Sequence, residues 1–556
     1  MTLDLIDRDE DIVLDPEEQY QSIVRAFKRK RGFGLFFIVC DRGKGEEIIN
    51  RVKQDVPNKK IEILRFFKPI NTLYDKIERL TKEKEIDILF IRGIEYSLYQ
   101  YELKKFGKIT ENQYNNFTSV PRILNHLNQQ RERFRDNFKI RFVFILPPFA
   151  RNYFIYRAPD FFDWSSGKWE FPMEPEVVEE KSRLILMEGD YEKYLSLSSQ
   201  ERVEKILEFE ELLGEKPQKK DDRVGLFFEL GNLLIADKEY EGAIASYEKA
   251  IEIKPDYHQA WNNRGNAQYY LGEYREAIAS YEKAIEIKPD YHQAWYNRGN
   301  AQSDLGEYRE AIASYEKAIQ IKPDYHQACY NRGNAQSDLG EYREAIASYE
   351  KAIQIKPDKD EACYNRGNAQ YYLGEYREAI ASYEKAIQIK PDKDEAWYNR
   401  GNAQYYLGEY REAIASYEKA IQIKPDYHDA WNNRGNAQSD LGEYREAIAS
   451  YDKAIQFKPD YHQAWNNRGI AQSDLEEYRE AIASYDKAIE IKPDDHLAWY
   501  NKACCYAKQD NLEEALENLK QAIALNPKKC REDAKTDSDF DKIREDERFK
   551  TLIFGT

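Results

Sequence analysis

The sequence has few of the residues that build metal centres and disulfide frameworks. Its 556 residues include six cysteines and seven histidines. No two cysteines stand in a CxxC or CxxxxC arrangement, so their spacing fits neither a zinc site nor a set of disulfides. No Ser/His/Asp or Cys/His set can be assembled into a catalytic centre either. The composition therefore predicts reduced thiols, no metal and no cofactor.

Long apolar runs are also absent. No stretch of eighteen apolar residues could span a bilayer, and the mean hydropathy is -0.84. The first residues carry acidic side chains where a secretory signal needs an apolar run behind a basic start, namely Asp4, Asp7, Asp9, Glu10 and Asp11. These absences predict a cytoplasmic protein that does not enter membranes.

Positive charge is scarce over the longer part of the chain. Residues 1–172 hold 31 Lys and Arg against 26 Asp and Glu, which leaves 53 against 75 for the remainder and a net charge of -17 overall. An acidic protein is a poor general partner for phosphate backbones, because neutralising those phosphates drives non-specific binding. We therefore expect no nucleic-acid partner.

A period of 34 residues fills more than half of the chain. It runs over residues 224–529 and gives nine complete units. In the third unit apolar and small residues recur at helical spacing, Gly306 stands where a first helix would end, and Pro323 stands where a second would end. Each unit is therefore predicted to be two antiparallel helices.

The repeated positions carry a pattern of aromatic and small residues. In the second unit these positions are Trp261, Gly265, Ala277, Tyr281, Ala284 and Pro289. Their spacing resembles the tetratricopeptide repeat family, whose unit also has 34 residues. The resemblance implies an all-α right-handed solenoid in which the first helix of each unit lines a concave surface.

Two positions depart from the family pattern. Arg264 stands where the family usually has leucine, and Gln268 stands where it usually has tyrosine; both recur in later units. Neither change alters the helical period. The first aromatic place becomes Cys329 and Cys363 in the fourth and fifth units, where we predict small apolar core residues.

The array needs covered ends, because one unit cannot bury its apolar face alone. Residues 530–556 are predicted to form one C-terminal capping helix, in which Phe540, Ile543, Phe549 and Leu552 share a face. Residues 173–223 are predicted to form a helical linker that caps the first unit.

Residues 34–146 alternate strand-like apolar runs with helical stretches, which predicts an α/β domain of three layers around a parallel sheet over residues 1–172. The predicted strands are 35–40, 61–66, 86–91 and 140–146, and the predicted helices are 46–54, 73–80 and 121–136. This order resembles the P-loop ATPase domain of bacterial signal-transduction NTPases.

The phosphate-binding residues of that family are incomplete here. A working P-loop needs GxxxxGK[ST], in which amides cradle phosphates and the hydroxyl binds magnesium. Lys44 lies between two glycines without a following Ser or Thr, and Arg92 stands where the third strand should end in a carboxylate. We therefore predict a degenerate domain and a protein that is not an enzyme. The alternative is a regulated NTPase switch, in which Lys44 holds nucleotide and the repeats sense a ligand.

Asparagine recurs at the sixth and ninth places of the units, both on the first helix. An Asn side chain offers one acceptor and two donors, so it can pair with the C=O and the N–H of an extended peptide. The predicted peptide-binding asparagines are Asn232, Asn263, Asn266, Asn297, Asn300, Asn331, Asn334, Asn365, Asn368, Asn399, Asn402, Asn433 and Asn436.

Tyrosines at the fifth place would add aromatic contact area to the same surface. They are Tyr296, Tyr330, Tyr364 and Tyr398. Aspartates at the thirteenth place, such as Asp304 and Asp440, favour a partner with some basic character. The sequence thus predicts a scaffold that binds an extended protein segment in an Asn- and Tyr-lined groove. Two alternatives stay open: the asparagines bond inside the array or to water, or the array is a structural spacer.

Overall fold

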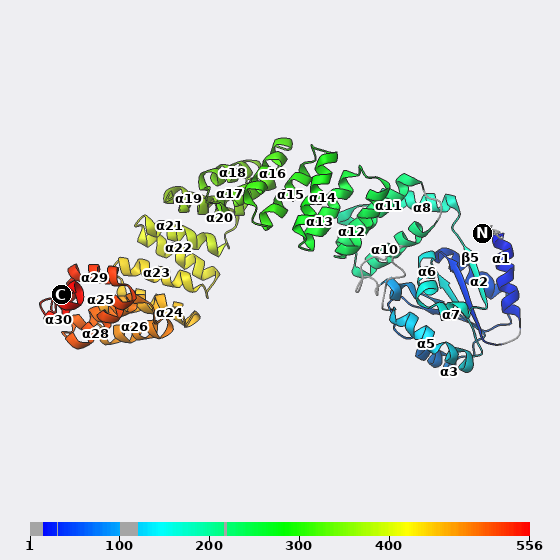
Figure 1. The fold of residues 1–556 in the computed structure, drawn as a ribbon, viewed down its shortest axis with the longest axis horizontal. Coiled ribbons are helices and arrows are strands. Elements are labelled where there is room, and N and C mark those ends of the chain that lie inside the picture. Colours follow the sequence, from blue (N-terminus) through cyan, green and yellow to red (C-terminus); the bar gives the residue numbers. More distant parts are fainter. Residues whose placement is uncertain (1–14, 30–31, 100–119, 216–218, 556) are drawn as a thin grey trace, which may run out of the picture. The chain divides into compact units, whose positions relative to one another are not determined.

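The computed structural model describes residues 15–29, 32–99, 120–215 and 219–555 (Figure 1). The chain divides into two compact units, Met1–Leu305 and Gly306–Thr556. The boundary falls inside the third repeat, between its first helix α15 (His292–Asp304) and its second helix α16 (Tyr308–Ile321). The first unit thus contains an α/β domain, a helical segment and the first repeats, and the second contains the rest of the array.

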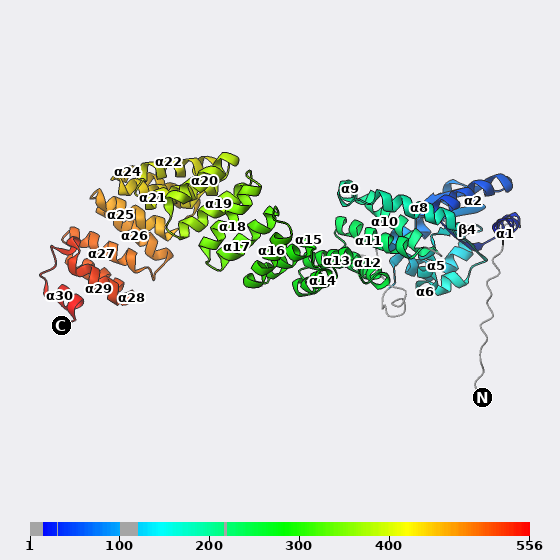
Figure 2. The ribbon, with the colours of Figure 1, turned by 90° about the horizontal axis from the view of Figure 1, so that it is seen from above.

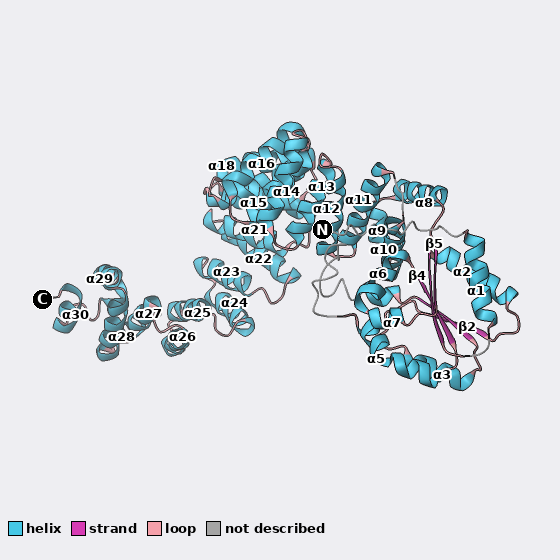
Figure 3. Ribbon diagram, turned by 45° about the vertical axis from the view of Figure 1, so that its right-hand side comes forward, coloured by secondary structure: helices cyan, strands magenta, loops and turns pink. Residues whose placement is uncertain are grey.

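A parallel sheet of five strands forms the centre of the α/β domain (Figure 3). Its strands are β1 (Gly34–Cys40), β2 (Ile61–Arg65), β3 (Ile88–Arg92), β4 (Arg141–Leu146) and β5 (Gly167–Phe171), in the order β2-β3-β4-β1-β5. The four predicted strands are confirmed to within two residues at each end. The edge strand β5 is missing from the prediction, since its alternating charged residues Lys168 and Glu170 give a weak strand signal.

Helices cover both faces of this sheet, as the three-layer prediction requires. Leu35 and Phe37 of β1 point into a core formed with α3 (Tyr74–Glu83), α5 (Arg122–Asn137), α6 (Pro148–Arg157) and α7 (Pro159–Asp163). Phe36 and Ile38 point to the opposite core, formed with α1 (Pro16–Lys28) and α2 (Arg42–Asp55). This alternation follows from the two-residue period of a strand.

Three helices follow the sheet domain, in the segment predicted to be a helical linker. They are α8 (Pro175–Glu188), α9 (Tyr191–Ser196) and α10 (Ser199–Gly214). Ser198 and Glu201 form a reciprocal capping box at the start of α10. Apolar residues of these helices, including Ile206 and Phe209, share one core with the first repeat helix α11 (Lys220–Ala236).

The repeat array consists of paired helices, as the period predicts (Figure 2). In the first compact unit the repeat helices are α11, α12 (Tyr240–Ile253), α13 (His258–Tyr270), α14 (Tyr274–Ile287) and α15. In the second unit they are α16, α17 (His326–Asp338), α18 (Tyr342–Ile355), α19 (Asp360–Tyr372), α20 (Tyr376–Ile389), α21 (Asp394–Tyr406), α22 (Tyr410–Ile423), α23 (His428–Asp440), α24 (Tyr444–Phe457), α25 (His462–Asp474), α26 (Tyr478–Ile491), α27 (His496–Lys508) and α28 (Leu512–Leu525). Over the described residues, no helix is both long enough and apolar enough to cross a membrane.

The glycine at the eighth place of a unit lets the two helices of a hairpin approach each other. A Cβ atom added to Gly367 would lie 2.6 Å from Cε1 of Tyr383, and the ring of Tyr383 is buried. The same relation holds at Gly265, where Cε1 of Tyr281 would lie 2.5 Å away. The ring of the second helix therefore occupies the space that a side chain on the first would need.

The two departures from the family pattern form an internal hydrogen-bond chain. Nε of Arg366 donates to Oγ of Ser382 at 2.9 Å, and that hydroxyl donates to Oε1 of Gln370 at 2.6 Å. Ser382 and Gln370 are both buried. In this repeat the polar replacements are thus satisfied by one another, as buried polar groups require. Around Arg400 and Arg434 the serine–glutamine bond is kept, whereas Nε of the arginine has no hydrogen-bond partner. Cys329 and Cys363 are buried free thiols, as predicted.

In the second compact unit an ion pair stabilises the junction between two successive hairpins, those that begin with α19 and α21. At α23 the ring of His428 meets the ring of Tyr461 edge-on, with centroids 5.4 Å apart. At α19 an aspartate takes the histidine's place, and Nζ of Lys393 lies 2.9 Å from Oδ2 of Asp360. Both side chains are less than 15% exposed, at 13% for the lysine and 14% for the aspartate.

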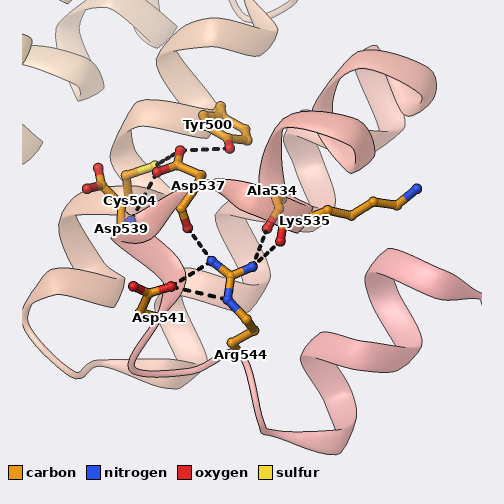
Figure 4. A network of polar contacts seen from close by, with 8 residues as sticks. All are labelled: Tyr500, Cys504, Ala534, Lys535, Asp537, Asp539, Asp541 and Arg544. Atoms are coloured by element: carbon orange, nitrogen blue, oxygen red, sulfur yellow. Dashed lines mark hydrogen bonds and ion pairs between the residues drawn. The ribbon is translucent and has the colours of Figure 1, made fainter.

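The C-terminal cap is not the single helix that the sequence predicts. It consists of α29 (Pro527–Thr536), a 3-10 turn (Ser538–Phe540) and α30 (Glu547–Phe554). The predicted apolar residues Phe540, Ile543 and Phe549 do cover the last hairpin. Between the two helices Arg544 donates to the backbone oxygens of Lys535 and Asp537, and this stabilises the bend (Figure 4). The acidic residues between the two helices gave no sequence signal for the end of a helix, so the prediction joined the two into one.

The turn between α25 and α26 has Glu476 where the second to seventh repeats have glycine, and restoring the glycine is expected to stabilise the protein. Glu476 has φ of 62°, whereas the equivalent Gly442 has φ of 79°. A left-handed conformation costs a residue with a Cβ atom about 1 kcal/mol, so we expect Glu476→Gly to raise the free energy of unfolding by that amount. Denaturant unfolding measures this, with Glu477→Gly as the control that should not stabilise. An unchanged or lower midpoint for Glu476→Gly would contradict the expectation.

Candidate functional site

The sixth- and ninth-place asparagines form a hydrogen-bonded ladder between neighbouring hairpins. Nδ2 of Asn297 donates to Oδ1 of Asn266 at 3.0 Å in the first unit. In the second compact unit the same bond joins Asn365 to Asn334 at 3.1 Å, Asn399 to Asn368 at 3.2 Å, Asn433 to Asn402 at 3.0 Å and Asn467 to Asn436 at 3.1 Å. The ladder therefore links the first helices of neighbouring hairpins within each compact unit.

The fifth place uses the second hydrogen of the same amide. Nδ2 of Asn365 donates to the hydroxyl of Tyr330 at 3.0 Å, and Nδ2 of Asn399 to that of Tyr364 at 2.9 Å. Burial raises the pKa of both tyrosines, so their hydroxyls stay protonated at neutral pH. Hydrogen bonding inside the array, one of the two open alternatives, thus accounts for the sixth-place donors.

A tyrosine of the second helix completes the ladder. The hydroxyl of Tyr383 donates to Oδ1 of Asn368 at 2.9 Å, and the same oxygen accepts the bond from Asn399. The ladder consumes the sixth-place Nδ2 and the ninth-place Oδ1. Some of the remaining amide atoms bond to a neighbour on the same helix: Oδ1 of Asn433 accepts from Asn432 at 3.1 Å, and Nδ2 of Asn402 donates to Oδ1 of Asn399 at 3.4 Å. An amide oxygen has two lone pairs and an amide nitrogen has two hydrogens, so such a bond uses only part of the capacity of each atom.

A hollow lies beside this ladder in the first compact unit, at its second and third repeats. It has a volume of about 250 Å³ and is lined by Asn266, Tyr269, Tyr270, Tyr281, Tyr296, Asn297 and Asn300. The same seven residue types return three repeats later in the second unit, as Asn368, Tyr371, Tyr372, Tyr383, Tyr398, Asn399 and Asn402. Predicted asparagines and a predicted fifth-place tyrosine therefore lie together at one hollow.

All of the predicted asparagines and fifth-place tyrosines are half-buried on the first helices. Two kinds of lining residue were missed. Tyr281 belongs to a second helix, and its place in the repeat indicated core packing alone. Tyr270 is 59% exposed at the thirteenth place, where four other repeats carry aspartate. Its replacement of a charged residue was the available signal.

At the carboxyl end of β1, the chain's own carboxylate occupies the start of α2. Oδ1 of Asp41 accepts hydrogen bonds from the amides of Gly43 at 2.8 Å and Lys44 at 3.2 Å. Nζ of Lys44 lies 2.9 Å from Oε1 of Glu47, and Arg92 pairs with Glu46. The amides and the lysine that would hold a phosphate are thus engaged within the domain.

A cavity of about 460 Å³ adjoins this turn, between α2 and α10. Its lining includes Asp41, Lys181 and several glutamates of α10. Nε of Arg42 lies 3.2 Å from Oε1 of Glu211, which is 6% exposed. Burial raises the pKa of Glu211 to about 7, although Arg42 opposes the shift. This is an acidic site, unlike one that binds a triphosphate.

Two family models match the array. The model described as "Tetratricopeptide repeat" matches residues 292–325, 326–359, 394–427, 428–461, 462–495 and 496–529, and the model described as "TPR repeat" matches 231–272, 265–306 and 367–408. Together they cover more than half of the chain. The chain belongs to the tetratricopeptide repeat family, and six of the predicted units coincide with the matched segments.

Several solved structures resemble parts of the chain. YrrB, described as a TPR protein with an unusual peptide-binding site, is 26% identical over 33% of this chain and 95% of its own, with a TM-score of 0.31. MamA is 28% identical over 29% of this chain and 94% of its own, with a TM-score of 0.29. The C-terminal part of a TPR protein from Cytophaga hutchinsonii is 20% identical over 43% and 98%, with a TM-score of 0.40. No curated protein matches the chain.

Proposed function

We propose that this protein is a cytoplasmic scaffold whose array binds an extended protein segment along the asparagine ladder. Membership of the tetratricopeptide repeat family supports a protein-interaction role. The observation that carries the finer proposal is the hollow lined by amides and tyrosines, whose lining recurs in the second unit. The six buried free thiols fit a reducing compartment.

The sixth-place Oδ1 has two lone pairs and the ninth-place Nδ2 has two hydrogens, so each atom can also bond to a partner where a neighbouring asparagine uses one of them. Neighbouring packed helices are separated by roughly 10 Å, and an extended chain advances about 3.3 Å per residue. About three residues of a bound segment therefore pass each hairpin. Oδ1 of the sixth-place Asn receives a backbone N–H of that segment, and Nδ2 of the ninth-place Asn donates to a backbone C=O. Such contacts hold a segment largely irrespective of its side chains.

Replacing ninth-place asparagines tests this function. The eighth unit already carries Ile470 at the ninth place, so Asn368→Ile with Asn402→Ile is expected to preserve the helices. A partner captured from native extract by the full chain should bind the double variant about tenfold more weakly, because two donors are lost. Gln422→Ala, on an exposed second-helix position, is the control. Equal binding by all three proteins would refute the groove and leave a spacer.

We further propose that the α/β domain neither binds nor hydrolyses nucleotide, in contrast to a regulated NTPase switch. The support is the occupied start of α2, where Asp41 takes the amides of Gly43 and Lys44. A thermal-shift titration with ATP and magnesium should leave the melting midpoint unchanged, as should the same titration of Lys44→Ala. A dose-dependent rise that disappears in Lys44→Ala would favour the switch.

A further inference from the structure

Three hairpin junctions among the described residues present an exposed, stacked pair of tyrosines, and two of them also carry an aspartate. Tyr270 is 59% exposed and stacks on Tyr240 with ring centroids 5.3 Å apart. Tyr406 is 60% exposed and stacks on Tyr376, also at 5.3 Å. The two pairs lie in different compact units and have the same geometry. One ring face of each stack is turned to its partner, which leaves an aromatic surface at the end of the first helix.

A second tyrosine stands at right angles to each exposed ring. Tyr269 lies edge-on to Tyr270 with centroids 6.0 Å apart, and Tyr405 lies edge-on to Tyr406 at 5.9 Å. Their hydroxyls donate to carboxylates of the following hairpin, Tyr269 to Asp304 and Tyr405 to Asp440, the latter at 2.6 Å. Each junction thus joins aromatic faces to one exposed carboxylate, and we call it an aromatic corner.

We propose that each aromatic corner, formed by Tyr269, Tyr270 and Asp304 or by Tyr405, Tyr406 and Asp440, binds an arginine side chain of the partner segment. This inference rests on the proposed function, and it names the side chain that the array selects. Tyr269 and Tyr270 also line the 250 Å³ hollow beside the ladder. An arginine at the corner therefore lies next to a backbone held by the asparagines.

The corner meets both requirements of a guanidinium group. A planar guanidinium lies flat on an aromatic face while its edge donates to a carboxylate. A carboxylate has about four lone-pair directions, and the tyrosine hydroxyl uses one of them. A lysine ammonium has no flat face to stack, so it gains less from the same corner. The chemistry favours arginine.

The fifth repeat of the array has the same arrangement of tyrosines without the carboxylate. Tyr372 stacks on Tyr342 at 5.2 Å, and Tyr371 lies edge-on to Tyr372 at 6.0 Å, as in the other two. Tyr406 occupies the place equivalent to Asp440, and its ring lies 5.8 Å from that of Tyr371. The chain therefore folds with tyrosine at the carboxylate position, which provides a matched substitution.

The test uses the full chain and three synthetic peptides of glycine, alanine and serine that differ at one central residue. That residue is arginine, citrulline or lysine, and citrulline keeps the shape of arginine without its charge. At low ionic strength the arginine peptide should bind about tenfold more tightly than the citrulline peptide, by titration calorimetry. The lysine peptide should fall between them. The double variant Asp304→Tyr with Asp440→Tyr should lose this preference and keep the wild-type melting midpoint.

The outcomes separate the corner from the groove. If the three peptides bind the wild-type chain equally, and Asn368→Ile with Asn402→Ile weakens all of them, the corner is wrong and the groove stands. If the arginine preference survives in that asparagine variant but not in the aspartate variant, the corner stands without the ladder. An arginine preference that persists in the aspartate variant, or a lysine peptide that binds as tightly as the arginine peptide, would overturn the corner.

Discussion

Replacing Glu211 with glutamine should make the stability of the sheet domain and α10 less dependent on pH. Burial raises the pKa of this carboxyl from 4.5 to about 7. The folded protein therefore keeps the proton at pH values where the unfolded chain has released it. The stabilisation is complete below about pH 4.5 and is lost as the pH rises through 7. The loss amounts to about 3 kcal/mol in the wild-type chain.

Hydrogen exchange of peptides from β1 and α10 measures this effect at a series of pH values. The free energy of opening measured by exchange should fall in the wild-type protein between pH 5 and 7.5. In Glu211→Gln this fall should be smaller by most of that 3 kcal/mol. Glu208→Gln is a matched control, because Glu208 lies on the same helix with its side chain 45% exposed. Parallel profiles for the wild type and Glu211→Gln would contradict the assignment of a buried, proton-binding carboxyl.

The second large effect is expected for Gly367→Ala. The new methyl group would lie 2.6 Å from Cε1 of Tyr383, whose ring is buried and whose hydroxyl is bonded to Asn368. The two helices must then separate, which breaks packing on both sides of the ring. Overpacking of this kind should cost about 2 kcal/mol. Because repeat arrays open locally, exchange of amides in α19 and α20 should reveal the loss first.

The control for this change is Gly374→Ala in the following turn. Gly374 has φ of 77° and open space around it, so the alanine suffers backbone strain of about 1 kcal/mol and no clash. The difference between the two variants measures the packing contribution. Equal losses would mean that the Tyr383 ring moves aside, and that the close approach of the helices is not the reason for the glycine.

The repeat array could be predicted from sequence because its signal is redundant. The spacing of Trp261, Gly265 and Pro289 returns in later units, so one unit confirms the next. The parallel strands were equally plain, since β1, β3 and β4 are almost continuous apolar runs. The edge strand β5 and the bend at Arg544 were missed, because each depends on contacts from distant residues and has little apolar pattern of its own.

The candidate site could be predicted as a set of residues but not as a set of bonds. Sequence indicated that Asn365 and Asn368 lie on one helix face, and periodicity alone supports that statement. It could not indicate that Nδ2 of Asn365 bonds to Asn334 and Tyr330 of the preceding hairpin. Those contacts decide which amide atoms remain for a partner. The exposed stack of Tyr406 on Tyr376 likewise depends on how neighbouring hairpins pack.

The ion pair between Asp360 and Lys393 bears on how the chain finds its native arrangement. Successive hairpins of this array are nearly identical, so a hairpin could dock on the wrong neighbour with little loss of apolar contact. Docking α21 anywhere other than on α19 would leave a largely covered lysine and a largely covered aspartate without each other. The Asp360–Lys393 pair thus distinguishes this junction from those at which a histidine stands at the first place, and it favours the native order of the hairpins.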